Sequence, residues 1–182
     1  MRTNETAIFI DGPNVFATAK ALGFDVDYKL LLEFYRLNTD LLRAYYYTAV
    51  RERNEEHDSI RPLLDWLEYN GYTLVQKPTK EWANPDGGRP KIKGNMDIEI
   101  AVDAMEMADN IKHAVFFTGD GDFKPLILAM QRKGVRCTVV SSIETKPPMC
   151  SDELRRTADT FIELRELNKW LTEPMRKVSK YA

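Results

Sequence analysis

Residues 114–123 read AVFFTGDGDF, and this stretch decides the fold of the chain. An apolar run ends abruptly in small and acidic residues, which is typical of a buried parallel strand whose carboxyl end opens onto a site. Its two glycines allow a tight turn, and its two carboxylates follow the strand closely. Asp and Gly are also ordinary turn and capping residues, so the stretch taken alone fits a plain strand-to-helix turn equally well.

A second stretch near the N-terminus repeats this pattern. Residues 7–14 read AIFIDGPN, so four apolar residues again run into Asp-Gly. Asp11 and Asp120 are therefore each expected at the carboxyl end of a strand. If the two strands are neighbours in a parallel sheet, their backbones lie roughly 5 Å apart. The two acids then face one site.

Strand patterns alternate with helical patterns along the chain. Strands are expected at residues 7–10, 41–50, 72–76, 113–118 and 135–141. Residues 77–94 are expected as a loop, and residues 151–171 as a helix that can break near Asp159. This alternation predicts an α/β fold with three layers, α/β/α, around a mostly parallel five-stranded sheet of Rossmann-like topology.

The usual nucleotide-binding versions of such a fold lack support in the sequence. No Gly-x-Gly-x-x-Gly follows the first strand, and no Walker lysine motif is present. The first motif cradles the phosphates of dinucleotides, and the second cradles those of nucleoside triphosphates. The site at the strand ends is therefore expected to depend on its acids.

A third acid reaches the same edge from the helix expected at residues 95–110. This helix precedes the strand at residues 113–118, so it begins at the carboxyl edge, with Asp97 in its first turn. At helical spacing Asp97 tops a stripe of small residues that lets the helix approach the sheet closely. The stripe consists of Ala101, Ala104 and Ala108. The alternative is simple electrostatic preference for an acid near a helix N-terminus.

A second acid of this helix falls on a different stripe. Asp103 lies in phase with Glu99 and Glu106, and the simplest interpretation of that stripe is a solvated face. Asp103 is therefore kept as the weaker candidate, and Asp97 is preferred.

Asp122 opens the helix that follows Asp120, so four carboxylates converge at one edge. Clustered carboxylates repel one another, and a divalent cation removes the conflict. Oxygen ligation of this kind suits Mg²⁺ or Mn²⁺, which activates water and stabilises developing charge in phosphoryl transfer. The expected metal ligands are Asp11, Asp97, Asp120 and Asp122.

Two polar residues complete the predicted catalytic set. Asn14 is expected to hold a carboxylate or the scissile phosphate, and its alternative role is a hydrogen bond at the helix start. Thr118 offers a hydroxyl to the metal shell or the phosphate, and its alternative role is that of a β-branched strand residue.

Basic residues gather in or beside the loop that leads to the acidic edge. Together with an aromatic residue they form the predicted nucleic-acid-binding set: Lys77, Lys80, Trp82, Arg89, Lys91 and Lys93. Basic side chains contact phosphates, and an exposed aromatic ring can stack on an unpaired base. The alternative is a solvated loop with Trp82 tucked onto the core.

Length and composition narrow the class of protein. The 182 residues are expected to form one domain, residues 1–182, with residues 172–182 as a flexible basic tail. The formal net charge of −2 excludes general polyanion binding, so any nucleic-acid contact needs a local patch. Two cysteines give neither a disulfide framework nor metal spacing, and Cys137 is expected in the core. With no signal peptide and no membrane-spanning stretch, a cytoplasmic location is the default expectation.

The combination of motifs resembles the NYN family, in particular its LabA-like branch, within the PIN-like nuclease superfamily. The matching pieces are residues 9–14 (FIDGPN), Lys93-Gly94 followed by Asp97, and residues 118–123 (TGDGDF). The helix at residues 98–108, with its second acid Asp103, also resembles the middle segment of that family. The resemblance implies a PIN-like fold and a metal-dependent nuclease site acting on RNA. It carries over onto Asp11, Asn14, Asp97, Asp120 and Asp122.

The function expected from residues and resemblance together is a Mg²⁺- or Mn²⁺-dependent ribonuclease, with an endonuclease favoured over an exonuclease. Its partner is RNA, single-stranded or structured, and a homodimer is left open. One rival is a non-catalytic regulator of the same fold that binds RNA or protein. A second rival is a phosphatase for small substrates, which would not need the basic loop.

Overall fold

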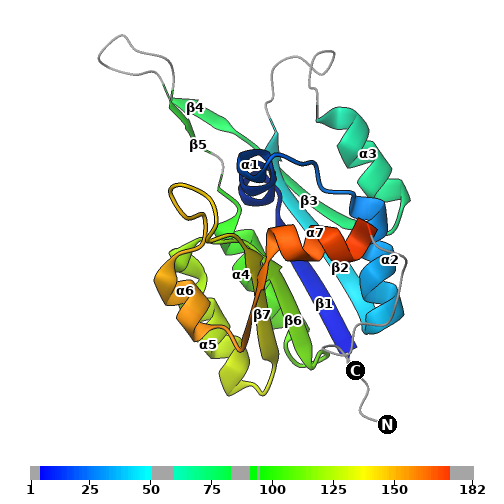
Figure 1. Cartoon of the computed structure of the whole chain (residues 1–182), viewed down its shortest axis with the longest axis vertical. Coiled ribbons are helices and arrows are strands. Elements are labelled where there is room, and N and C mark those ends of the chain that lie inside the picture. Colours follow the sequence, from blue (N-terminus) through cyan, green and yellow to red (C-terminus); the bar gives the residue numbers. More distant parts are fainter. Residues whose placement is uncertain (1–4, 51–59, 83–90, 94, 173–182) are drawn as a thin grey trace.

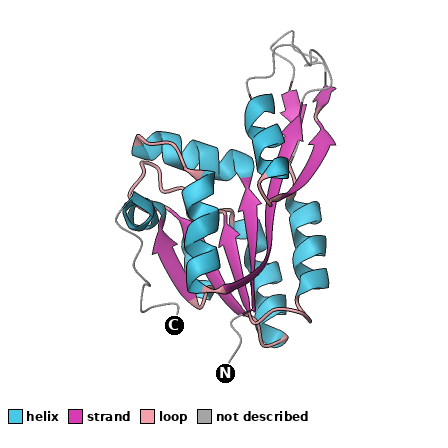
Figure 2. Ribbon diagram, turned by 90° about the vertical axis from the view of Figure 1, so that its right-hand side faces the viewer, coloured by secondary structure: helices cyan, strands magenta, loops and turns pink. Residues whose placement is uncertain are grey.

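Two layers of helices enclose one sheet in the computed structural model of the chain (Figures 1 and 2). The structure describes residues 5–50, 60–82, 91–93 and 95–172, and for residues 80–82 and 91–93 it describes the backbone. The central sheet is six-stranded and all parallel, with the strand order β3-β2-β1-β6-β7-β8. The predicted α/β class and three-layer arrangement are confirmed, whereas the predicted number of five strands is wrong.

The elements have the following bounds. The strands of the central sheet are β1 (Glu5–Asp11), β2 (Asp40–Val50), β3 (Thr73–Pro78), β6 (His113–Phe117), β7 (Arg136–Ser141) and β8 (Thr160–Glu163). The helices are α1 (Gly12–Leu22), α2 (Tyr28–Asn38), α3 (Arg61–Tyr69), α4 (Asp97–Met107), α5 (Lys124–Arg132), α6 (Asp152–Thr157) and α7 (Leu164–Thr172). A short 3₁₀ turn, Gly121–Phe123, precedes α5.

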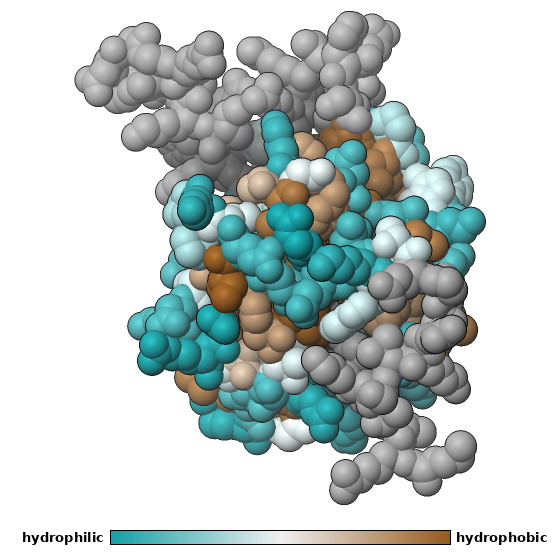
Figure 3. All heavy atoms as spheres, viewed as in Figure 1, coloured by the Kyte–Doolittle hydropathy of each residue, from teal (hydrophilic) through white to brown (hydrophobic). Residues whose placement is uncertain are grey.

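The two faces of the sheet have separate hydrophobic cores. Alternate residues of one strand point to opposite faces, so Ile8 and Ile10 join one core while Ala7 and Phe9 join the other. Helices α1, α2, α3 and α7 cover the first face, and α4, α5 and α6 cover the second. Figure 3 views the molecule from the side of α1 and α7, where hydrophilic side chains form most of the surface. Cys137 is fully buried in the second core, as predicted.

The sixth strand lies in residues 151–171, predicted as a helix that can break near Asp159; the chain does leave the helix there, but a strand follows the break. The chain leaves α6 at Asp159, whose carboxylate accepts a hydrogen bond from the Cys137 amide at 2.7 Å. The Asp159 amide in turn donates to the Cys137 carbonyl oxygen at 3.0 Å. These contacts hold the chain against β7, and β8 then pairs with it in parallel. A strand of four residues is too short for its period to be distinguished from a helical pattern.

The segment predicted as a loop, residues 77–94, contains a small antiparallel hairpin. Its strands are β4 (Lys80–Trp82) and β5 (Lys91–Lys93), with Lys80 opposite Lys93 and Trp82 opposite Lys91. The hairpin follows β3 and leads directly toward the first turn of α4 (Figure 1). Residues 83–90, including Arg89, lie outside the described residues, as does the predicted tail from residue 173 onward.

The strand order reverses at β1. From β1 the chain proceeds to β2 and β3 on one side, and later through β6, β7 and β8 on the other. In open parallel sheets, ligands bind where the order reverses, at the carboxyl ends of the strands. Here that point lies between the ends of β1 and β6, where Ile10 is paired with Phe117.

A buried histidine at the opposite edge of the sheet makes the stability of the fold sensitive to acid. Burial, and after it the charge of Arg136, lower the pKa of His113 to about 4, against the opposing charge of Asp159. The imidazole Nε2 lies 2.8 Å from the Thr138 hydroxyl. Between pH 4 and 6.5 the native state therefore binds fewer protons than the unfolded chain, so the free energy of unfolding falls as the pH falls.

We expect His113→Gln to flatten this loss, since glutamine keeps a polar group beside Thr138 and does not titrate. Urea unfolding of both proteins from pH 7 to pH 4 measures the difference. The free energy of unfolding of wild type should fall by up to about 3 kcal/mol more than that of the variant across this interval. Equal losses would show that His113 does not set the acid limit.

Candidate functional site

The turn after β6 brings two acids to the carboxyl edge of the sheet. Asp120 accepts a hydrogen bond from the Asp122 amide at 2.9 Å, which closes the 3₁₀ turn and starts α5. Gly119 lies where a side chain has no room, because a Cβ there would meet the Met149 carbonyl and lie 2.6 Å from the Ser141 hydroxyl. The glycine thus lets the turn pack against the loop that follows β7.

The turn after β1 is tied to the turn after β6 through Asp11. Asp11 ends β1 and caps α1, with its carboxylate accepting from the Asn14 amide at 3.4 Å. Its second oxygen accepts from the Thr118 hydroxyl at 3.2 Å, and the same hydroxyl accepts from the Asp120 amide at 3.3 Å. Thr118 therefore fixes the spacing between the two strand ends, as a positioning residue.

Asn14 provides a second link between these turns. Its side-chain oxygen accepts a hydrogen bond from the Gly119 amide at 3.1 Å. Of the roles considered for Asn14, the structure shows this contact to the opposite turn, 105 residues away in sequence. The turns carrying Asp11 and Asp120 are thus held together by side chains on both sides.

The third segment of the site is the start of α4. The buried side of this helix contains Ile100, Ala104 and Ala108, and Asp97 is its first residue. Asn95, just before the helix, donates a hydrogen bond from its side-chain nitrogen to the Asp97 carboxylate. Asp97, Asp120 and Asp122 each offer a carboxylate oxygen, and these oxygens lie within 4.8 Å of one another. Three of the four predicted ligands therefore form one cluster.

Asp11 lies beside this cluster and interacts with it electrostatically. Burial raises the pKa of Asp11 to about 6; the Asn14 and Thr118 hydrogen bonds lower it, and the charges of Asp97 and Asp120 raise it. Burial also raises the pKa of Asp97, followed by the charges of Asp120 and Asp122. These acids destabilise one another in their charged forms, which is the condition that a bound cation relieves. Carboxylate oxygens alone suit Mg²⁺ or Mn²⁺, so the donor set fits the predicted metal.

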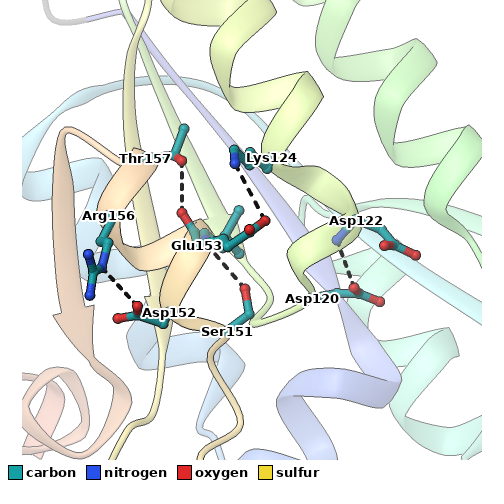
Figure 4. A network of polar contacts seen from close by, with 9 residues as sticks. Asp120, Asp122, Lys124, Ser151, Asp152, Glu153, Arg156 and Thr157 are labelled. Carbon is teal, nitrogen blue, oxygen red and sulfur yellow. Dashed lines mark hydrogen bonds and ion pairs between the residues drawn. The ribbon is translucent and has the colours of Figure 1, made fainter.

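Among the described residues, the two lysines nearest to this cluster in sequence or in charge effect pair with other acids. Figure 4 shows Lys124, two residues after Asp122, directed toward Glu153 of α6, at 3.4 Å. Lys77 is the described cation whose charge lowers the pKa of Asp97, but its ammonium group contacts both oxygens of Glu99 at 2.9 Å. The cluster is therefore negatively charged on balance.

The second acidic stripe of α4 is not the solvated face that the sequence suggested. Asp103 is half-buried and accepts a hydrogen bond at 2.9 Å from the hydroxyl of Tyr47, a fully buried residue of β2. Glu99 is bound to Lys77 at the end of β3. These two contacts hold α4 on the sheet and so help to fix Asp97. Periodicity could not identify them, because the partners come from other strands.

The predicted nucleic-acid-binding residues have different environments. Lys77 is occupied by Glu99, which was not expected. The backbone of the hairpin carries Lys80, Trp82, Lys91 and Lys93, and Arg89 lies outside the described residues.

Comparison with known families agrees with this geometry. The NYN domain family matches residues 5–166. The chain belongs to the NYN domain family. Within it the chain is LabA-like: it is 32% identical to the low amplitude and bright protein LabA of Synechococcus elongatus, over 96% of this chain and 91% of that protein. The predicted membership of this branch of the PIN-like nuclease superfamily is confirmed.

Two further proteins are similar to this NYN domain. An uncharacterized protein from Methanocaldococcus jannaschii is 28% identical over 71% of this chain and 56% of its own length. A crystal structure of a protein of unknown function from Vibrio parahaemolyticus superposes with a TM-score of 0.68 at 24% identity, covering 89% of this chain and 93% of that one. The latter supports the fold. Among the helices that the structure describes, none is both long and apolar enough to cross a membrane.

The raised pKa of Asp11 predicts that the metal-free protein becomes less stable as the pH rises. Between about pH 4 and pH 6 the native state binds more protons than the unfolded chain, so the free energy of unfolding falls as the pH rises. Asp11→Asn removes the charge and keeps one acceptor oxygen, while its NH2 group replaces the second oxygen as a hydrogen-bond donor facing one of the two partners, the Asn14 amide or the Thr118 hydroxyl. At pH 7 with EDTA the variant should be about 1–3 kcal/mol more stable than wild type.

Urea unfolding at several pH values measures this difference, which should grow from pH 4 to pH 6 and then stay constant. Asp40→Asn, at the exposed start of β2, is the matched control and should change stability little. A less stable Asp11→Asn protein at pH 7 contradicts the electrostatic account.

Proposed function

We propose that this NYN domain is a Mg²⁺- or Mn²⁺-dependent ribonuclease that hydrolyses phosphodiester bonds within RNA strands. One observation carries the proposal: carboxylates from the ends of β1 and β6 and from the start of α4 gather where the strand order reverses. This is where an α/β sheet binds its ligand. Membership of the NYN domain family supports nuclease chemistry, and the clustered carboxylates could bind the metal that this chemistry uses.

Asp97, Asp120 and Asp122 are proposed to hold the cation, with Asp11 as the fourth carboxylate. A bound Mg²⁺ or Mn²⁺ would lower the pKa of a water molecule and would place positive charge opposite the phosphate. The three aspartates are spaced for a common ion, since their carboxylate oxygens lie within 4.8 Å of one another. Asn95 orients Asp97, and the charge of Lys77 lowers the pKa of Asp97 while the charge of Glu99 raises it.

Asp11 has the protonation behaviour of a group that handles a proton near neutral pH. Without a metal its pKa of about 6 lies near neutrality, and Asp11 is proposed as the general base that orients and deprotonates the attacking water. Thr118 and the Asn14 amide fix the direction of its two oxygens. Thr118 and Asn14 thus act as positioning residues rather than as metal ligands.

The hairpin β4–β5 is proposed to guide the RNA toward the acids. Its strands carry Lys80, Lys91 and Lys93, with Trp82 among them, and β5 leads into the segment that begins α4. Basic residues neutralise phosphates and an aromatic side chain stacks on unpaired bases. Arg89 is proposed to belong to the same surface. Lys77 is removed from it, because Glu99 already binds its ammonium group.

Residues 1–182 are proposed to act as one domain on RNA in the cytoplasm. A homodimer stays a prediction. A protein that binds Mn²⁺ but leaves RNA intact would instead be the non-catalytic regulator considered from the sequence.

The two acids of α4 provide a matched test. Asp97→Asn removes a charge from the cluster while keeping the shape, so it should reduce metal-dependent RNA cleavage at least 100-fold, as expected for loss of a metal ligand. Asp103→Asn keeps an acceptor for the Tyr47 hydroxyl, so cleavage should stay within a few-fold of wild type. Cleavage of single-stranded and structured RNA is measured with Mn²⁺, with Mg²⁺ and with EDTA.

Circular dichroism checks that both variants fold. A dead Asp103→Asn protein beside an active Asp97→Asn protein would overturn the ligand assignment. Cleavage that continues in EDTA would overturn metal dependence.

A further inference from the structure

A cavity of about 560 Å³ is lined by residues from α1, β2, the start of α2 and α3, among them Gly12, the neighbour of Asp11. It opens on the face of the sheet covered by α1 and α3, at the carboxyl end of β2. Its walls include Gly12, Pro13 and Phe16 of α1, Tyr46 of β2, Tyr28 of α2 and Leu63 of α3. In Figure 3 hydrophobic side chains gather between α1 and the start of α3. Its volume is in the range of small-molecule sites.

This cavity comes close to Asp11 through the residue that follows it in the chain. Gly12, which lines the cavity, directly follows Asp11 in the chain. A Cβ at position 12 would lie 2.7 Å from the Tyr46 ring, so only glycine allows this close approach. The charge of Asp11 also helps to raise the pKa of Tyr46, after burial, so the phenol and the carboxylate are near neighbours. A strand bound at the acids therefore has the cavity within reach of its next nucleotide.

The cavity offers flat apolar faces together with a few polar groups. The Phe16 ring is 61% exposed on the surface of α1, with the Lys20 ammonium 5.9 Å from its centroid. Tyr28 and Tyr46 meet edge to face at 5.4 Å, and the Tyr28 hydroxyl donates to that of Tyr46. The carboxylate of Asp25 and the hydroxyl of Thr48 add hydrogen-bonding groups. Aromatic faces with a few polar groups are how proteins hold an unstacked nucleobase.

We infer that this cavity binds one base of the RNA strand whose phosphate lies at the acidic cluster, an inference that rests on the proposed ribonuclease function. The base stacks on Phe16 and its edge meets the polar groups of the wall. The Lys20 ammonium lies over the Phe16 ring, so the base stacks on the other face and Lys20 neutralises the adjoining phosphate. The base pocket then fixes which phosphodiester reaches the carboxylates, so that single-stranded or unpaired RNA is preferred. A free nucleoside shares the same chemistry and is the competing source of ligand.

Binding is measured in EDTA, where no cleavage is expected, with short single-stranded RNAs that each carry one abasic nucleotide. For wild type, one position along the strand should weaken binding about tenfold when its base is removed, as expected for the loss of one stacked base. Phe16→Ala should bind intact RNA about tenfold more weakly and respond no further to the abasic nucleotide at that position. Phe16→Trp should restore the wild-type response. Tyr69→Ala, which removes a ring that is 88% exposed elsewhere on α3, is the matched control.

The outcomes separate this inference from the proposed function. If wild type and Phe16→Ala respond alike at every abasic position, the base pocket is overturned, while Mn²⁺-dependent cleavage of intact RNA would leave the ribonuclease standing. If adenosine or uridine binds in a Phe16-dependent way and no abasic position matters, the cavity serves a free nucleoside and the inference is wrong. If wild type neither binds nor cuts RNA, the proposed ribonuclease function is wrong, and the base pocket that rests on it is wrong as well.

Discussion

The parallel pairing of β1 with β6 is the constraint on which the candidate site depends. It brings the turn after Asp11 beside the turn after Thr118, although the two are more than 100 residues apart in sequence. The Thr118 hydroxyl and the Asn14 amide oxygen then fix the two turns to each other at 3.2 and 3.1 Å. Helix α4 adds Asp97 because its buried alanines let it lie close to the sheet. Without this strand pairing, Asp11 would not lie beside Asp120.

The same arrangement also places acidic side chains close enough to repel one another. Acids that are partly buried near one another are less stable in their charged forms, and the raised pKa values of Asp11 and Asp97 express that cost. Most of the described chain follows ordinary rules of packing and capping, as the Asp27 cap of α2 and the Ser151 cap of α6 illustrate. Asp11 and Asp97, where the strand order reverses, depart from those rules. Local conflict inside an otherwise consistent fold is expected where a protein binds a ligand.

Sequence reasoning predicted the parts of this site that depend on local pattern. Apolar runs ending in Asp-Gly located Asp11 and Asp120, and the helical phase of α4 separated Asp97 from Asp103. It missed features that depend on distant partners: the Tyr47 contact of Asp103, the Lys77 contact of Glu99 and the pairing of β8 with β7. Each joins residues more than twenty positions apart, and periodicity describes only one segment at a time. The hairpin was missed for a different reason, since its three-residue strands are too short to show a pattern.

Cation binding at Asp97, Asp120 and Asp122 is the claim on which the chemistry rests. Anomalous X-ray scattering from crystals of the protein soaked in Mn²⁺ tests it most directly. The account predicts a manganese peak among these three carboxylates, with Asp11 beside it, and no peak there in crystals of Asp120→Asn/Asp122→Asn. A well-ordered wild-type site that stays empty while manganese binds elsewhere would contradict the account.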